Sequence, residues 1–345
     1  MSPRFSPARR RWTAIAAAIT AATLALTGCA SAGGSDGTPE GSTEGYPVAV
    51  DHVYGTTTIE SEPQRIVTLG WQSQDVLAAL GTVPVGTTDF TWGSVDKYLP
   101  WFEERVEELG GELPEIVQFT DAGGLDYEQI LGLDPDLILA MHSGITDVEY
   151  ERLTEIAPTV AYAETAWASD WKEVTTTIGD IMGKSDEAQK LVDDTDAYID
   201  EQAAAHPEFD GVVLTYGWYL ADGATALDFY LPIDPRVQVM EQLGFVTSPQ
   251  VIELGETSDA FYEGVSLEEL DSVESEFHLA WSDTPADETR TLENPLVARW
   301  APIAAGHYYF IDDQALAWAS SQPSVLSIPW SLDELLPAFS EALAK

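Results

Sequence analysis

Residues 171–205, WKEVTTTIGDIMGKSDEAQKLVDDTDAYIDEQAAA, form the stretch that decides how this chain folds. Its apolar side chains recur at helical spacing, at Val174, Ile178, Ile181, Met182, Ala188, Leu191, Val192 and Tyr198. Only Gly179 and Gly183 interrupt the pattern. Because the stretch is more than twice as long as an average helix, we predict one long and rigid helix.

Short apolar runs alternate with helical patterns on both sides of this helix. The runs before it are 65–70, 83–86, 116–119, 136–140 and 158–162, and those after it are 212–216, 277–281 and 307–311. Strands separated by helices are typical of parallel α/β layers. We therefore predict an α/β fold with an N-terminal lobe at 46–168, a spanning helix at 169–207 and a C-terminal lobe at 208–345.

The first 45 residues have the features of an export signal and a tether. Four arginines precede an apolar stretch, Trp12 to Leu26, that is shorter than the roughly 20 residues needed to span a bilayer. The segment 26–29, Leu-Thr-Gly-Cys, resembles the lipobox of bacterial lipoproteins, in which the cysteine is lipidated. We expect a signal peptide at 1–28, with a lipidated Cys29 and a flexible tether at 29–45. The general and the twin-arginine export routes both remain open.

The charge of the chain excludes some classes of partner. The chain has 59 Asp and Glu against 15 Lys and Arg, with a formal net charge of −44. Such a chain repels phosphate backbones, so we do not expect it to bind nucleic acid. Disorder does not explain the charge, because 45% of the residues are hydrophobic and 11 are Trp. A solvated acidic surface accounts for most of these residues.

A faint internal repeat relates the two lobes. Residues 125–130, LDYEQI, precede the strand 136–140, and residues 265–270, VSLEEL, precede the strand that follows Glu276. In both copies the glutamate lies eight residues before the acidic residue that heads the strand. Two matching acidic helices would form a pseudo-symmetric surface for a partner.

These segments together resemble a known family. The resemblance runs through 64–81, 125–140, 150–162, 171–194, 294–313 and 327–336, in the expected order. It is to the periplasmic binding proteins that serve iron-siderophore and cobalamin ABC importers. The resemblance implies two Rossmann-like lobes, a spanning helix that limits closure, and a ligand in the cleft between the lobes. It also implies that one glutamate on each lobe, Glu128 and Glu268 here, docks into arginine pockets of the two permease subunits.

The predicted ligand site lies at the carboxyl ends of the strands, where open α/β lobes bind ligands. Aromatic residues follow strand after strand. We select as cleft residues Trp71, Trp92, His142, Trp167, Trp218, Tyr219, Arg236 and Trp281. An aromatic cleft suits a bulky, partly apolar ferric chelate. Because arginines are few, a neutral or cationic hydroxamate siderophore is favoured over an anionic tris-catecholate, and we expect a monomeric carrier without a cofactor of its own.

Three alternatives stay open. Cobalamin or haem could replace the siderophore. Direct metal binding is less favoured, because the five histidines are scattered and Cys29 is assigned to lipid. Catalysis is disfavoured, because Ser143-Gly144 lacks a nucleophile-elbow pattern and no glycine-rich loop opens a helix.

Overall fold

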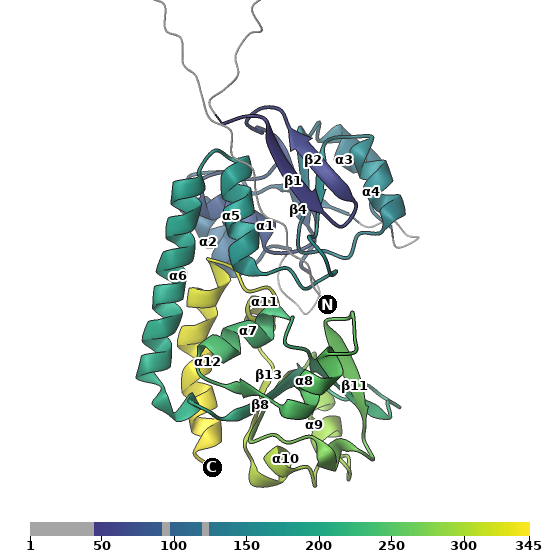
Figure 1. The fold of residues 1–345 in the computed structure, drawn as a ribbon, viewed down its shortest axis with the longest axis vertical. Helices are drawn as coiled ribbons and strands as arrows, with labels where there is room; N and C mark the ends of the chain where they lie inside the picture. Colours follow the sequence, from purple (N-terminus) through teal and green to yellow (C-terminus); the bar gives the residue numbers. More distant parts are fainter. Residues whose placement is uncertain (1–44, 92–96, 119–123) are drawn as a thin grey trace, which may run out of the picture. The chain divides into compact units, whose positions relative to one another are not determined.

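Two sheets of mainly parallel strands form the body of the protein (Figure 1). The computed structural model describes residues 45–91, 97–118 and 124–345. The described residues after Gly41 belong to one compact unit. The α/β fold class is confirmed.

The first sheet is fully parallel and has the order β5-β4-β3-β6-β7. Its strands are β3 (Ile66–Thr68), β4 (Gly86–Thr88), β5 (Glu115–Val117), β6 (Leu137–Ala140) and β7 (Thr159–Ala161). Its helices are α1 (Ser73–Ala79), α2 (Pro100–Glu108), α3 (Tyr127–Gly132) and α4 (Asp147–Thr154). The strand predicted at 83–86 starts only at Gly86, because Pro84 has no N–H to donate to a neighbouring strand. An antiparallel hairpin that we did not predict, β1 (Val48–His52) and β2 (Gly55–Ile59), precedes this sheet.

The second sheet is mixed, with the order β11-β9-β8-β12-β13 and β10 beside β8. Its strands are β8 (Val213–Trp218), β9 (Ala226–Tyr230), β10 (Val246–Thr247), β11 (Tyr262–Ser266), β12 (Phe277–Trp281) and β13 (Tyr308–Ile311). Its helices are α7 (Pro235–Gln242), α8 (Pro249–Gly255), α9 (Pro285–Glu293), α10 (Ala301–Ala305), α11 (Gln314–Ser321) and α12 (Ser327–Leu343). Strand β9 is antiparallel to both β8 and β11, so this sheet departs from the purely parallel pattern.

The predicted spanning segment consists of two packed helices rather than one. Helix α5 (Trp171–Ile181) is followed by the long helix α6 (Ser185–Ala205). Between them Gly183 has a φ of 64°, and the Lys184 N–H donates to the Gly179 carbonyl at 2.7 Å. A left-handed residue at this point ends a helix in the usual way, so the interruption visible in the sequence is a real break.

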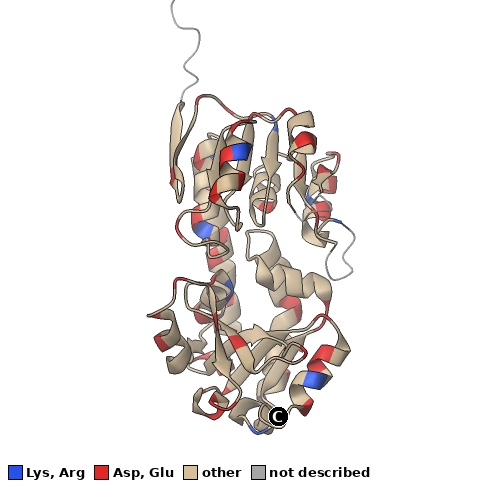
Figure 2. Cartoon of the chain, turned by 90° about the vertical axis from the view of Figure 1, so that its right-hand side faces the viewer, with Lys and Arg blue, Asp and Glu red and all other residues tan. Residues whose placement is uncertain are grey.

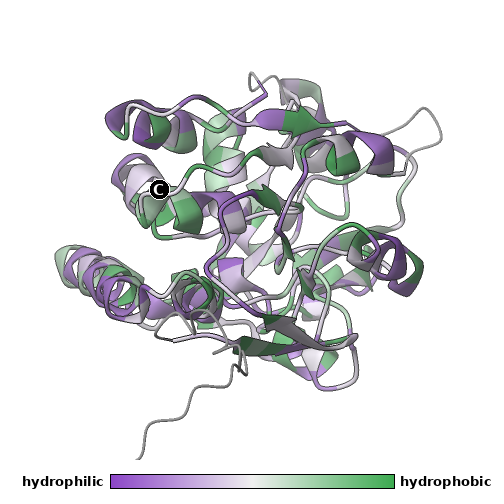
Figure 3. Ribbon diagram, turned by 90° about the horizontal axis from the view of Figure 1, so that it is seen from above, coloured by the Kyte–Doolittle hydropathy of each residue, from purple (hydrophilic) through white to green (hydrophobic). Residues whose placement is uncertain are grey.

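Helix α6 joins the cores of the two sheets (Figure 1). Ala188 is buried in the cluster under the first sheet, whereas Val192 and Ile199 are buried in the cluster of the second. Leu191 packs against both clusters. Figure 3 shows hydrophobic and hydrophilic residues mixed along the helices. One helix that is buried in two cores restricts their relative movement.

The internal repeat has a structural basis in the two sheets. The Asp136 carboxylate accepts hydrogen bonds from the backbone N–H groups of Gln64 and Arg65, at 2.7 and 2.9 Å. The Glu276 carboxylate accepts one from the Val213 N–H at 2.9 Å. Each acidic side chain thus accepts hydrogen bonds from backbone N–H groups where an adjacent strand begins, β3 for Asp136 and β8 for Glu276. The expectation of two matching acidic helices is wrong, because Glu128 lies on α3 but Glu268 lies in a turn before the 3-10 helix Leu270–Ser272.

Acidic residues are spread over the helices and loops, with few basic residues between them (Figure 2). None of the helices within the described ranges is long and apolar enough to cross a bilayer.

A buried polar junction connects α1 to the segment before α12. Asp75, on α1, accepts hydrogen bonds from Ser324 Oγ at 2.7 Å and from Trp101 Nε1 at 2.8 Å. The Gln74 amide donates to Gln322 Oε1 at 3.2 Å. Asp75 is fully buried. Burial raises the pKa of Asp75 to about 6, although the hydrogen bonds from Ser324 and Trp101 oppose this.

The raised pKa of Asp75 predicts how stability changes with pH. The folded protein binds this proton more tightly than the unfolded chain, so the contribution is full below about pH 4 and is lost as the pH rises through about 6. Between pH 4 and 7.5 the wild type should lose about 3 kcal/mol of unfolding free energy more than Asp75→Asn. Urea unfolding at a series of pH values measures this. Asp210→Asn, at an exposed site, should follow the wild type, and parallel curves for all three proteins would contradict the prediction.

Candidate functional site

A cavity of about 350 Å³, which we call the main cavity, lies between the carboxyl ends of strands from both sheets. Ten residues line it, and eight of them are aromatic. They are Trp71, Trp167, Trp218, Tyr219, Tyr230, Arg236, Phe261, Trp281, Trp318 and Ser321. Six of the eight predicted cleft residues are therefore brought together here.

The first sheet contributes Trp71 and Trp167. Trp71 follows β3, and its backbone N–H donates a hydrogen bond to the His142 carbonyl at 2.9 Å. Gly70, with a φ of 83°, makes this approach feasible, because a Cβ there would lie 2.3 Å from the same carbonyl oxygen. The Trp71 ring lies 4.7 Å from the Trp167 ring and 5.2 Å from the Trp318 ring of α11. Three indoles thus form one continuous wall.

The second sheet contributes Trp218 at the end of β8 and Trp281 at the end of β12. Their ring centroids are 6.5 Å apart, and the Tyr230 ring lies 5.2 Å from that of Trp218. The indole N–H of Trp281 donates to the Tyr230 hydroxyl at 2.8 Å. These contacts hold the rings in place before any ligand enters.

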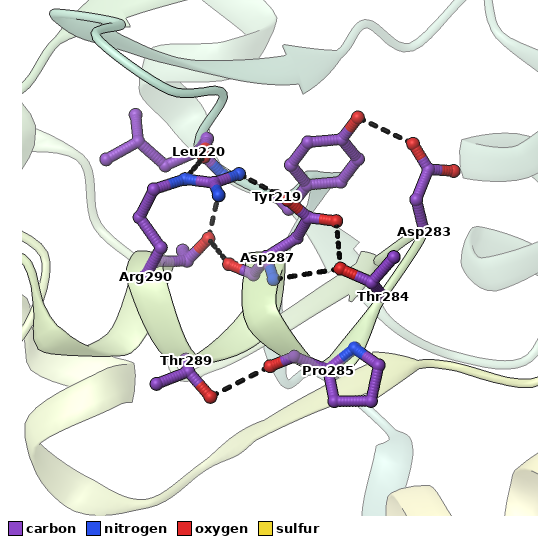
Figure 4. Close-up of polar contacts among 9 residues, drawn as sticks. Tyr219, Leu220, Asp283, Thr284, Pro285, Asp287, Thr289 and Arg290 are labelled. Carbon is purple, nitrogen blue, oxygen red and sulfur yellow. Dashed lines mark hydrogen bonds and ion pairs between the residues drawn. The ribbon is translucent and has the colours of Figure 1, made fainter.

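Tyr219 is held by a polar network at the N-terminal end of α9 (Figure 4). Its hydroxyl donates to Asp283 Oδ2 at 2.7 Å, and this bond, followed by burial, raises the pKa of Tyr219 to about 12. Arg290 donates through Nε to the Leu220 carbonyl at 2.9 Å and also pairs with Asp287. Arg290 thus holds the backbone beside Tyr219 and supports the aromatic cavity without lining it.

Arg236 is the one basic side chain among the described residues that line the cavity. It is 4% exposed, and its Nε lies 2.9 Å from Oδ1 of the fully buried Asp234. Its guanidinium lies 3.9 Å from the centroid of the Tyr230 ring. Burial lowers the Arg236 pKa, but the negative charge of Asp234 outweighs this and the pKa is raised overall, so the pair is ionised. Because Asp234 compensates its charge, Arg236 adds little net positive charge to the cavity.

His142 and Trp92 are the predicted cleft residues not placed in this wall. His142 is fully buried behind Trp71, with the two rings stacked at 5.7 Å, and does not line the cavity. Burial and, to a lesser extent, the charge of Arg236 lower the His142 pKa to about 3, so the ring is neutral. Trp92 lies outside the described residues.

Four lining residues were missed by the sequence analysis: Tyr230, Phe261, Trp318 and Ser321. Tyr230 ends β9, and Phe261 directly precedes β11, its antiparallel partner. Trp318 and Ser321 are on α11, far along the chain from the strand ends. The only available signal was aromatic composition near a turn, which does not identify a tertiary neighbour.

A second cavity of about 270 Å³ adjoins the first and shares Trp71 and Trp167 with it. Its remaining lining residues come from the first lobe: Leu69, Gly70, Thr88, Asp89, Leu125, Ser143, Gly144, Ile145 and Glu149. Gly144 allows the Trp167 ring to lie close to the backbone, since a Cβ there would meet Trp167 Nε1 at 2.3 Å. We call this space the side cavity.

No three His, Cys, Asp or Glu side chains within residues 45–91, 97–118 and 124–345 are arranged to hold a metal ion. The chemistry available in the main cavity is that of aromatic faces and a compensated ion pair. These groups can enclose a bulky ligand.

Comparison with known proteins identifies the family of this chain. The sequence model of a family described as periplasmic binding protein matches residues 66–230. The structure of PiaA from Streptococcus pneumoniae TIGR4 in complex with ferrichrome is 32% identical, with a TM-score of 0.78, and the match covers 86% of this chain and 98% of that one. The chain belongs to the periplasmic binding protein family.

Other members of the periplasmic binding protein family are similar over different lengths. The Fe(3+)-citrate-binding protein YfmC of Bacillus subtilis (strain 168) is 25% identical, over 87% of this chain and 89% of that protein. The probable siderophore-binding lipoprotein YfiY of the same organism is 27% identical, over 59% of each chain. The resemblance found in the sequence is thus confirmed at the level of the family.

Proposed function

We propose that this protein is the substrate-binding lipoprotein of an ABC importer and that it carries a ferric siderophore of the hydroxamate type. The main cavity is the observation that carries this proposal. Within the described part of the chain, eight aromatic residues enclose it, and the one basic residue that lines it is already paired with Asp234. Aromatic faces match the apolar exterior of a chelate whose own oxygens surround the iron. An anionic tris-catecholate would find no uncompensated cation among the lining residues.

Ligand titrations test the proposal. A neutral ferric trihydroxamate such as ferrichrome should quench the tryptophan fluorescence of the purified protein and raise its melting temperature. Trp218→Ala should weaken binding about 10- to 100-fold, because stacking of a ligand on one aromatic side chain contributes about 1–3 kcal/mol. Trp300→Phe is the matched control, since Trp300 is buried outside the cavity. Stronger binding of ferric citrate, a ferric catecholate, haem or cobalamin would overturn the hydroxamate assignment.

We further propose that Glu128 and Glu268 dock the protein onto its permease. Both side chains are exposed, and neither carboxylate takes part in an ion pair or hydrogen bond that the structure shows among the described residues. A carboxylate that is free in this way can accept a bidentate pair of hydrogen bonds from an arginine. Since Glu128 lies near the first sheet and Glu268 near the second, one contact would be made by each lobe.

The lipid anchor at Cys29 is the third part of the proposal. Cys29→Ala should move the protein from the membrane fraction into the soluble fraction, because a protein without acyl chains loses their burial in the bilayer. Immunoblots of fractionated cells measure this shift, and ligand binding by the purified variant should stay unchanged. Ser31→Ala is the control. Retention of Cys29→Ala in the membrane fraction would contradict lipidation at this residue.

A further inference from the structure

The side cavity is lined by negatively charged side chains and would repel an anionic ligand. Two acidic side chains, Asp89 and Glu149, line it together with the hydroxyl-bearing Thr88 and Ser143. Among the residues that the structure describes, no Lys, Arg or His lines it. Counted with the compensated Arg236–Asp234 pair, the two adjoining cavities carry a net negative charge.

Each acidic side chain is anchored through one of its oxygens. Asp89 Oδ1 accepts hydrogen bonds from the Thr91 N–H at 2.9 Å and from its hydroxyl at 2.5 Å. Glu149 Oε2 accepts hydrogen bonds from the Thr146 N–H at 2.7 Å and its hydroxyl at 2.9 Å. The structure shows no hydrogen bond to Asp89 Oδ2 or Glu149 Oε1 among the described residues. Both carboxylates are thus oriented by local bonds and keep a second oxygen for a ligand.

Trp71 and Trp167 connect the two spaces. Both rings line the main cavity and the side cavity. A ligand that fills the main cavity therefore lies against the same two indoles that border the side cavity, and an arm of that ligand would enter the side cavity by passing over the edge of these rings. Indole faces and carboxylates both attract a cation, so the side cavity suits an alkylammonium group.

We propose that the side cavity binds a protonated amine arm carried by the ferric chelate. This inference rests on the proposed function, because the chelate itself occupies the main cavity. The substrate class becomes a ferric trihydroxamate with a pendant ammonium group. The arm donates hydrogen bonds to Asp89 and Glu149, and Trp71 and Trp167 cover its methylene groups.

A pair of ligands that differ only in the charge of the arm tests the inference. One is a linear ferric trihydroxamate that ends in a primary ammonium, and the other is the same chelate with that amine acetylated. The wild type should bind the ammonium form at least about 10-fold more tightly, since hydrogen bonds between charged partners are the stronger kind. This preference should decrease as the salt concentration rises.

Variants assign the preference to the side cavity. The double variant Asp89→Asn, Glu149→Gln should bind both ligands within about twofold of each other, with its affinity for the acetylated form close to that of the wild type. The amide oxygens of Asn and Gln can still accept from Thr91 and Thr146, so both local structures are retained. Glu151→Gln, which removes an exposed charge on the same helix, is the matched control and should keep the full preference.

The outcomes separate this inference from the proposed function. If the wild type binds both ligands equally, or if the double variant keeps the preference, the amine arm does not bind in the side cavity, while the hydroxamate carrier stands. If neither ligand binds, the proposed function fails and the inference fails with it.

Discussion

Replacing Glu128 and Glu268 together by lysine is expected to reduce uptake of the ferric chelate to less than about 1% of the wild-type rate. Each replacement places a positive charge opposite the arginine that the proposed permease pocket supplies, and juxtaposed like charges cost several kcal/mol. Both residues lie outside the cavity linings, so the affinity for the chelate should not change. Uptake of radiolabelled iron by cells whose own copy of the gene is deleted measures the first effect, and fluorescence titration measures the second.

A double variant on α6 controls for the change in net charge. Glu187→Lys with Glu201→Lys alters the same number of exposed acidic residues near the two ends of the long helix. Its uptake should remain close to that of the wild type. Normal uptake by the Glu128→Lys, Glu268→Lys protein would remove both residues from the docking surface. Equal loss in both double variants would instead assign the effect to overall charge.

The second large effect is expected at Arg236. Arg236→Met should lower the free energy of unfolding by about 3–5 kcal/mol, because it leaves the carboxylate of Asp234 buried without its cation. Asp234 is fully buried, and its Oδ2 has no hydrogen-bond partner among the described residues, so without the guanidinium the carboxylate keeps only the uncharged backbone N–H of residue 236 as a donor. Urea unfolding at pH 7.5 measures the loss.

A double-mutant cycle separates the ion pair from the packing of the arginine. Adding Asp234→Asn to Arg236→Met removes the unpaired charge. The Asn side chain can still cap α7, because its amide oxygen accepts the hydrogen bond from the backbone N–H of residue 236. The double variant should regain about 2 kcal/mol relative to Arg236→Met. Simple additivity of the two substitutions would show that the pair is not coupled.

The parts of the fold that were predictable are those with a local signal. Strands β3, β6, β8 and β12 are largely buried, so they are apolar runs in the sequence, and the half-buried β13 is a run of aromatic residues ending in Ile311. The β9–β11 pair was missed because its residues 226–230 and 262–266 mix polar and apolar side chains and include Gly264. A single helix was predicted across 169–207 because apolar spacing continues through Gly183, whereas the backbone turns there.

The candidate site divides in the same way. Trp71, Trp218 and Trp281 were identified because each lies at the end of a strand, and parallel strands bring their carboxyl ends to one edge. His142 satisfies the same rule but is buried behind Trp71, since the backbone approach allowed by Gly70 directs the indole over it. Trp318 satisfies no such rule, because α11 is brought to the cavity by packing against Phe90 and Trp71.

The α/β class, the membership in the periplasmic binding protein family and the acidic character of the chain follow from its amino-acid sequence, which also predicts the aromatic lining of the candidate site. These depend on composition and on short-range periodicity, which are properties of neighbouring residues. The compensation of Arg236 by Asp234 and the side cavity with Asp89 and Glu149 became visible in the folded protein alone. The reason is physical, because burial and the distance between charges depend on which distant segments pack together, and no local pattern specifies that packing.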